Sequence, residues 1–284
     1  MWLAYICSTC NFIFKRTNHH ILEFLLQQTQ YLPVLIIGLI VGYLSGLLGK
    51  GGSAISTPAL QIFAGVNPFF ALASPLPASI TSTLSATAVY RKEKLFNARV
   101  ILLSAGMAVP ATIAGSWCSS YLPGKTLMIL TAVFIMGIGI SLLYSFLKKK
   151  NTEEDTVVAA EDVPAVKLLG AAMGIGLLAG LLANAGGILF STFFIKKLKM
   201  PIKQALACAV VLSAILSVPG ALTHWWLGHI DWNIALLLSL TAFPASYLGA
   251  KTAVKMKTPA LEKLFAITLI IFGVYDIFFT IFGK

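Results

Sequence analysis

Long apolar runs dominate this chain and restrict what it can fold into. Hydrophobic residues make up 58% of its 284 residues and charged residues 11%, with a mean hydropathy of +0.87. A soluble domain carries about 25% charged residues. Several runs reach the roughly 20 residues that a helix needs to cross a bilayer, and none shows the ten-residue alternation of a membrane β-barrel. The sequence therefore predicts an all-α, multi-pass integral membrane protein of the plasma (inner) membrane, with the lipid bilayer as its surroundings.

Glycine-rich breaks interrupt two of these runs. The first is Gly49-Lys50-Gly51-Gly52-Ser53 and the second is Asn184-Ala185-Gly186-Gly187. Each glycine costs a helix about 1 kcal/mol relative to alanine, so each run is expected to form a broken or re-entrant pair of helices. Non-helical backbone at membrane depth needs protein or water around it.

Lys50 lies within the first break and has two interpretations. A lysine deep in a bilayer costs roughly 2.5–3.5 kcal/mol on insertion scales. The break could lie at the membrane surface, with Lys50 among the headgroups. The favoured interpretation is a polar cavity in which an anion offsets the charge of Lys50.

The second half of the chain repeats the pattern of the first. A Ser-Thr step follows each glycine pair at the same distance, at 56–57 and at 191–192. Ser79, Pro110, Gly115 and Gly139 recur 134 residues later as Ser213, Pro244, Gly249 and Gly273. The sequence predicts helical elements at 31–48, 53–64, 69–89, 99–120 and 125–147, and again at 166–183, 187–195, 202–223, 233–254 and 260–282, giving about eight full spans and two short broken pairs.

These elements divide the chain into four parts. Residues 1–30 are expected to be an N-terminal extension, 31–147 the first transmembrane repeat, and 166–284 the second. Residues 148–165 are rich in charge and poor in apolar groups, which favours a solvated, cytoplasmic linker.

The basic residues indicate how the two repeats face the membrane. Loops 90–99, 196–203 and 251–263 carry four Lys or Arg residues each. The equivalent loops of the other half, 224–233, 65–69 and 121–125, carry only Lys125 between them. Under the positive-inside rule, each repeat of four to five elements is inverted relative to the other.

Inverted repeats with interrupted helices are typical of secondary transporters. A channel of the same architecture is an open alternative. An enzyme is disfavoured, because no Walker loop, H-E-x-x-H or G-x-S-x-G motif is present. No cofactor or metal is expected, since the C-x-x-C of Cys7 and Cys10 has no second pair. The net charge of +11 is scattered through short loops, so no nucleic-acid partner is expected.

Three stretches resemble the TauE/SafE-type sulfite exporters, permeases for sulfite, sulfonates and related organosulfur anions. They are Ser45–Pro58 (S-G-L-L-G-K-G-G-S-A-I-S-T-P), the Ala71–Ser74 step, and Gly228–Asn233, which is similar to the family's Gly-x-x-Asp-Trp-Arg turn. The resemblance covers about residues 31–282 and implies a permease for a small anion of this class. Ser53 and Ile188 stand where the family usually has a third glycine, so the substrate can differ from sulfite.

Candidate site residues follow from the needs of an oxyanion, which binds backbone N–H groups, hydroxyls and helix N-termini. The third element is rich in hydroxyls, with Ser74, Ser82 and Ser85 on one face, although small residues also serve helix packing. His224, His229 and Asp231 form a candidate proton relay, for which an interfacial belt with nearby tryptophans is the alternative. The predicted substrate-binding residues are Lys50, Gly51, Gly52, Ser53, Ser74, Asn184, Gly186 and Gly187.

Overall fold

The computed structural model describes residues 31–49, 53–148, 165–182 and 186–282. Helices account for nearly all of this part of the chain, and it contains no strand. The elements are the helix Tyr31–Leu48, α2 (Ser53–Ala64), α3 (Pro68–Ala73), α4 (Pro75–Lys92), α5 (Ala98–Ser119), α6 (Gly124–Lys148), α7 (Ala165–Leu181), α8 (Gly186–Lys196), α9 (Ile202–Trp226), α10 (Trp232–Lys255) and α11 (Thr258–Phe282). The predicted all-α membrane class is therefore confirmed.

Five of the described helices are long and apolar enough to cross a membrane. They are Tyr31–Leu48, α5, α9, α10 and the Thr258–Tyr275 part of α11. The 17 residues of α7 and the 11 of α8 are shorter than such a helix, and α4 is rich in hydroxyl side chains. The prediction of about eight full spans therefore stays a prediction.

The third element was predicted as one helix over 69–89, and this is wrong. The structure breaks it at Ser74 into α3 and α4. Pro75 lacks a backbone N–H, so it interrupts the hydrogen-bond pattern of a continuous helix, although Ser74 keeps right-handed helical angles of φ −60° and ψ −27°. Ser74 accordingly ends α3, where its backbone N–H donates to Phe70 O, and also precedes α4.

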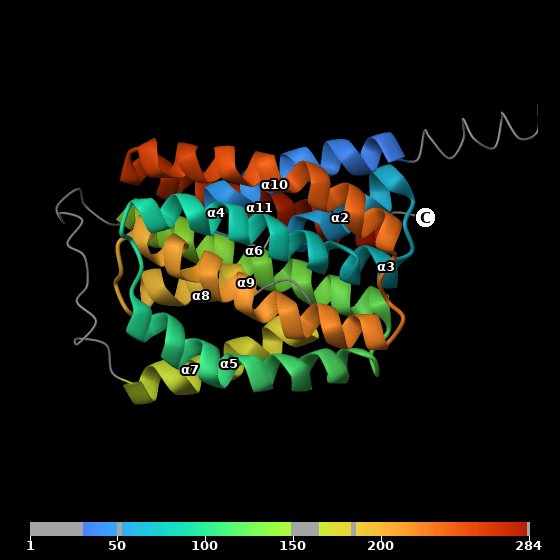
Figure 1. The fold of residues 1–284 in the computed structure, drawn as a ribbon, viewed down its shortest axis with the longest axis horizontal. Coiled ribbons are helices and arrows are strands. Elements are labelled where there is room, and N and C mark those ends of the chain that lie inside the picture. The colour runs from blue at the N-terminus through green and yellow to red at the C-terminus, as the bar shows by residue number, and fades with distance from the viewer. Residues whose placement is uncertain (1–30, 50–52, 149–164, 183–185, 283–284) are drawn as a thin grey trace, which may run out of the picture.

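The long helices lie along one axis and form an ordered stack (Figure 1). The Tyr31–Leu48 helix packs on α10, α10 on α4, α4 on α9, α9 on α5, and α5 on α7. The pair α6 and α11 packs together beside this stack. Each long helix of the first half thus packs mainly against helices of the second half, whereas the short helices α2 and α3 pack mainly against each other and α4. The apolar core is shared between the two halves.

Close helix contacts recur at a fixed spacing in the chain. A Cβ on Gly46 would overlap the carbonyl oxygen of Ser246, and a Cβ on Gly180 would overlap that of Thr112. Gly46 and Gly180 are 134 residues apart, as are Thr112 and Ser246. Small residues of this kind let helix backbones approach closely inside a membrane.

Three further contact pairs follow the same spacing. In each, a glycine contacts one residue, and the equivalent glycine contacts the equivalent residue. The contacts are Gly42 with Ala242 and Gly176 with Ala108, Gly249 with Tyr43 and Gly115 with Leu177, and Gly273 with Met136 and Gly139 with Ile270.

Turn geometry follows the same spacing. Lys94 and Gly228 both have positive φ, 54° and 71°, and so do Gly65 and Lys199, 62° and 52°. Asn97 caps α5 by accepting from Val100 N, and Asp231 caps α10 by accepting from Asn233 N and Ile234 N. Side-chain oxygens at this position satisfy N–H groups that the first helical turn leaves without partners.

Candidate functional site

The two glycine breaks are each followed by a short helix. α2 begins at Ser53 and has 12 residues, and α8 begins at Gly186 and has 11, so each is roughly 16–18 Å long and too short to cross a membrane alone. This confirms the short elements predicted at 53–64 and 187–195. Lys50, Gly51, Gly52 and Asn184 lie outside the described residues, and for Ser53 only the backbone is described.

Gly186 and Gly187 are buried at the start of α8. A Cβ on Gly186 would lie 3.1 Å from the Cβ of Ala179 on α7. This is tight but not prohibitive, so Gly186 is compatible both with close packing and with a ligand that approaches the start of α8.

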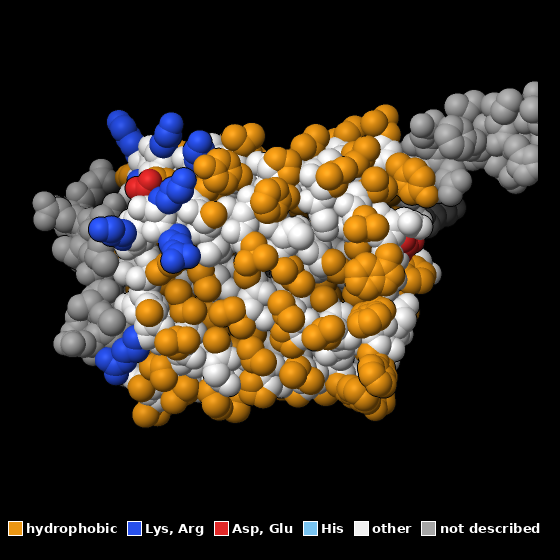
Figure 2. Space-filling model, viewed as in Figure 1, with side chains coloured by type: hydrophobic (Ala, Val, Ile, Leu, Met, Phe, Trp, Pro, Cys, Tyr) orange, Lys and Arg blue, Asp and Glu red, His pale blue; other side chains and the backbone are white. Residues whose placement is uncertain are grey.

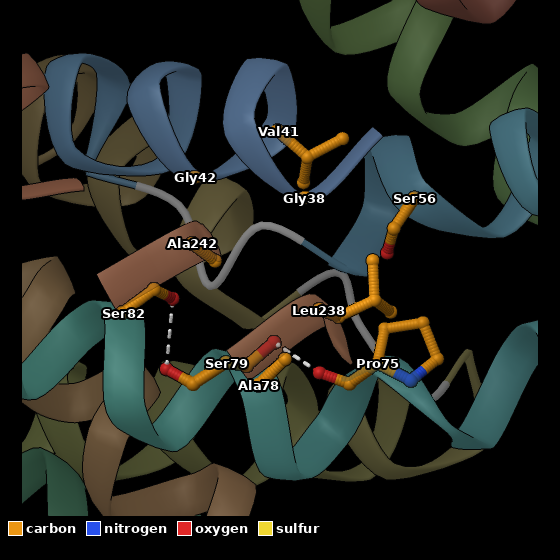
Figure 3. A pocket seen from close by; sticks show the side chains of 10 residues that line it. All are labelled: Gly38, Val41, Gly42, Ser56, Pro75, Ala78, Ser79, Ser82, Leu238 and Ala242. Carbon is orange, nitrogen blue, oxygen red and sulfur yellow. Dashed lines mark hydrogen bonds between the residues drawn. The ribbon is translucent and has the colours of Figure 1, made fainter. Parts of the chain in front are cut away.

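A small cavity lies among the Tyr31–Leu48 helix, α2, α4 and α10, one turn into α2 (Figure 3). Its volume is about 10 Å³, which is near the minimum for one water molecule. Figure 3 shows Ser56 of α2 on one side of it and Ser79 and Ser82 of α4 on the other. The other lining residues are apolar or glycine: Gly38, Val41, Gly42, Pro75, Ala78, Leu238 and Ala242.

The hydroxyls of α4 that line this cavity are tied to their own helix. Ser79 Oγ donates to Pro75 O at 3.0 Å, and Ser82 Oγ donates to Ser79 O at 3.2 Å. A hydroxyl has one donor and two acceptor positions, and back-bonded serines can turn toward a ligand by rotating about χ1. Ser85, predicted on the same face, instead donates to Phe243 O of α10 at 2.8 Å.

Buried hydroxyls on α5, α8 and α9 have no hydrogen-bond partner among the described residues. They belong to Ser104 of α5, Thr192 of α8 and Ser213 of α9. Ser213 corresponds to Ser79 at the 134-residue spacing, and Ser104 to Leu238, which lines the cavity. A buried hydroxyl without a partner costs about 1–3 kcal/mol, and ligand binding is one role that would offset this cost. The repeat pattern of the sequence had already paired Ser79 with Ser213.

The remaining predicted residues meet at the start of α4, beside Pro75, which lines this cavity. Ser74 Oγ accepts from Asp231 N at 2.9 Å, which joins the α3–α4 break to the start of α10. His224 Nδ1 and His229 Nδ1 lie 3.4 Å apart. His224 is 1% exposed and its Nε2 has no partner in the described part of the chain. Ser74 itself is not among the cavity-lining residues, although its neighbour Pro75 is.

The predicted relay is therefore brought together only in part. The two imidazoles are in contact, and the His229 ring also lies against Phe69, with 5.3 Å between centroids. The Oδ1 atom of Asp231 is engaged in capping α10. Capping is a structural use that sequence reasoning did not assign to Asp231. The described residues offer no group of three His, Cys, Asp or Glu side chains that could hold a metal ion.

Burial lowers the pKa of the His229 imidazole. The folded protein therefore resists protonation of His229, whereas the unfolded chain binds this proton near pH 6.5. Stability should be fully present above that pH and fall as the pH drops through and below it. We expect the thermal midpoint in detergent to decrease between pH 7.5 and 5.5, and to decrease less in His229→Gln. An identical pH slope in His229→Gln would contradict this assignment.

Comparison with known proteins agrees with this architecture. The family model described as sulfite exporter TauE/SafE matches residues 34–275. The probable membrane transporter protein YunE of Bacillus subtilis (strain 168) is 27% identical over 274 residues, covering 89% of this chain and 99% of that protein. The probable membrane transporter protein YfcA of Escherichia coli (strain K12) is 23% identical over 215 residues, covering 76% and 77%.

A third relative, the probable membrane transporter protein YjnA of Bacillus subtilis (strain 168), is 22% identical over 250 residues, covering 84% of this chain and 97% of that protein. No solved structure matches the chain significantly. Because the family model spans most of the apolar helices and both glycine breaks, the chain belongs to the sulfite exporter TauE/SafE family of membrane transporters.

Proposed function

We propose that this protein is a secondary transporter that moves a small anion of the sulfite, sulfonate or organosulfur class across the plasma membrane. The proposal rests on one observation above others: the helix contacts of the two halves are reciprocal. Gly46 contacts Ser246, and the equivalent residues Gly180 and Thr112 make the same contact. The helix contacts made by one half are therefore repeated by the other half. This supports two repeats related by a two-fold axis, the architecture of many secondary transporters.

The directions of the helices support inversion of the repeats. In Figure 1 the Tyr31–Leu48 helix (blue) begins at the right end of the molecule, and its counterpart α7 (yellow-green) begins at the left end. The basic loops of one half also correspond to weakly charged loops of the other. On this proposal the basic end of the molecule faces the cytoplasm.

The substrate site in this proposal lies between the two glycine breaks. The starts of α2 and α8 carry partial positive charge and free N–H groups, which favour an anion. Lys50, Gly51, Gly52 and Ser53 precede or open α2, and Asn184, Gly186 and Gly187 precede or open α8. The hydroxyls of Ser79 and Ser213 would complete the binding site.

The small cavity is consistent with a state of the transporter that is closed to the substrate. The cavity of about 10 Å³ holds no more than about one water molecule. A tetrahedral or pyramidal sulfur oxyanion is larger, so the helices around the cavity must separate to admit it. Movement of one repeat against the other is the usual way in which inverted-repeat transporters alternate access.

Uptake by proteoliposomes tests the proposed function directly. Sulfite, a set of sulfonates and simple inorganic anions are offered to purified protein, with and without a pH gradient. Saturable uptake of an organosulfur anion is the expected result. Flux that never saturates with anion concentration would instead favour a channel. Uptake that does not depend on the pH gradient would show that His224 and His229 do not couple transport to proton movement.

Lys50→Met tests the charge at the first break. This change keeps the side-chain length and removes the charge. We expect substrate binding to weaken by at least about 1.5 kcal/mol, the low end for a hydrogen bond to a charged group. We also expect the substrate-free protein to gain thermal stability, because a desolvated charge is lost. If Lys50 reaches the headgroups instead, neither the substrate-induced stabilisation nor the midpoint should move.

Reporter fusions test the inversion. A reporter fused after Lys94 is expected to be cytoplasmic, and one fused after Gly228 external, because these positions correspond at the 134-residue spacing. Enzymatic reporters that are active on only one side of the membrane measure this. Both reporters on one side would exclude inverted repeats.

A further inference from the structure

A groove runs between α4 and α10 on the outer surface of the helix stack. Its volume is about 490 Å³, within the range of small-molecule sites of roughly 300–1,000 Å³. The lining residues are Ser85 and Ala88 of α4 with Phe243, Pro244, Tyr247 and Leu248 of α10. The groove forms because Ser85 and Ala88 of α4 have small side chains. Phe243 and Leu248 of α10, which also line it, are 52% and 57% exposed.

The wall of this groove suits a hydrocarbon chain. The hydroxyl of Ser85 donates to Phe243 O at 2.8 Å, so it is already satisfied within the protein. Tyr247 supplies the only other side-chain polar atom among the lining residues. A polar ligand would therefore find few partners along the groove.

One end of the groove carries cations. Ser85 Oγ of α4 donates to Phe243 O of α10, Ser246 Oγ of α10 donates to Ser82 O of α4, and Ser74 accepts from Asp231 N at the start of α10. The two helices consequently run in the same direction and end side by side. Their last turns bring the exposed cations Arg91, Lys92, Lys251 and Lys255 to this end, with Glu93 as the neighbouring acid.

Lys251 connects the cationic end to the groove. Its Nζ lies 5.0 Å from the ring centroid of Tyr247, which itself lines the groove. Figure 2 shows Lys and Arg side chains gathered at this end of the visible face, with hydrophobic side chains over the remainder. A ligand with an apolar tail and an anionic head would match both features at once.

We propose that this groove binds one anionic phospholipid, with an acyl chain against Ala88, Phe243 and Leu248 and its phosphate beside Lys251 and Arg91. Basic sites between transmembrane helices recognise anionic headgroups in this way. A second copy of the chain fits less well, because a two-fold interface places the same surface on both subunits and would bring these cations together.

The test uses the purified, delipidated protein in detergent, titrated with phosphatidylglycerol or with zwitterionic phosphatidylethanolamine. Native mass spectrometry and the thermal midpoint are measured. Phosphatidylglycerol is expected to bind more tightly and to stabilise more. The double variant Arg91→Gln/Lys251→Gln should weaken phosphatidylglycerol binding by about fivefold per charge removed, while binding of phosphatidylethanolamine stays unchanged.

Ala88→Phe fills the groove and should weaken binding of both lipids. The matched controls are Lys167→Gln/Lys197→Gln, which removes two exposed charges elsewhere, and Ala114→Phe, which enlarges an exposed alanine of α5. Both controls should bind as the unchanged protein does. Equal stabilisation by the two lipids, or unchanged binding by Ala88→Phe, would overturn the proposal. So would a dimer that Ala88→Phe dissociates, because a second copy would then occupy the groove.

Discussion

Gly46→Ala and Gly180→Ala are each expected to destabilise the protein by roughly 3 kcal/mol or more and to abolish transport. The added methyl groups would overlap the carbonyl oxygens of Ser246 and Thr112. A flexible side chain can move aside, but a helix backbone can yield only if the two helices separate. Separation of α5 from α7 would also stretch the bond from Ser116 Oγ to Gly180 O, 3.4 Å.

Glycines on open surfaces provide the matched controls. Nothing lies within 4 Å of a Cβ on Gly106 of α5 or Gly170 of α7. Alanine at either position should leave packing intact and favour the helix by up to about 1 kcal/mol. Gly46→Ala and Gly180→Ala should therefore lower the stability of the protein, whereas Gly106→Ala and Gly170→Ala should leave it unchanged or raise it. This difference is measured as the thermal midpoint in one detergent together with uptake, and equal midpoints for all four variants would contradict the prediction.

The architecture was largely predictable because membrane insertion and close packing leave strong marks on a sequence. Run length and glycine breaks located the helices around α2 and α8, and the 134-residue spacing located equivalent positions. That spacing acquires a physical meaning in the structure, since residues such as Gly115 and Gly249 recur where helix backbones nearly touch. The repeated small residues therefore mark positions of close helix contact. The sequence alone did not show which of these positions contact one another.

The wrong or missed predictions also have identifiable physical causes. The break at Ser74 depends on whether Pro75 starts a new helix or kinks an existing one, and the two outcomes share the same local sequence. The roles of Ser74 and Asp231 depend on a contact between residues 157 positions apart. Hydroxyl periodicity placed Ser82 and Ser85 on one face, but only three-dimensional packing separates the cavity-lining Ser82 from Ser85, which binds α10.

Ser79→Ala and Ser213→Ala are each expected to raise the KM for the transported anion by about tenfold or more, because a hydrogen bond to a charged group contributes about 1.5–3 kcal/mol. The two residues occupy equivalent positions on α4 and α9. In the absence of substrate their stability effects should differ. Ser79 Oγ already donates to Pro75 O, whereas Ser213 Oγ is buried without a partner in the described part of the structure.

Ser213→Ala should therefore leave the substrate-free protein as stable or slightly more stable, since it removes an unsatisfied polar atom. Ser79→Ala should be neutral or slightly destabilising. Ser120→Ala, at the exposed end of α5 where the hydroxyl donates to Trp117 O, serves as the control and should change neither KM nor the midpoint. Uptake kinetics and thermal midpoints of the three variants separate substrate binding from packing. A normal KM in both Ser79→Ala and Ser213→Ala would mean that the anion bypasses these hydroxyls, leaving the starts of α2 and α8 to bind it.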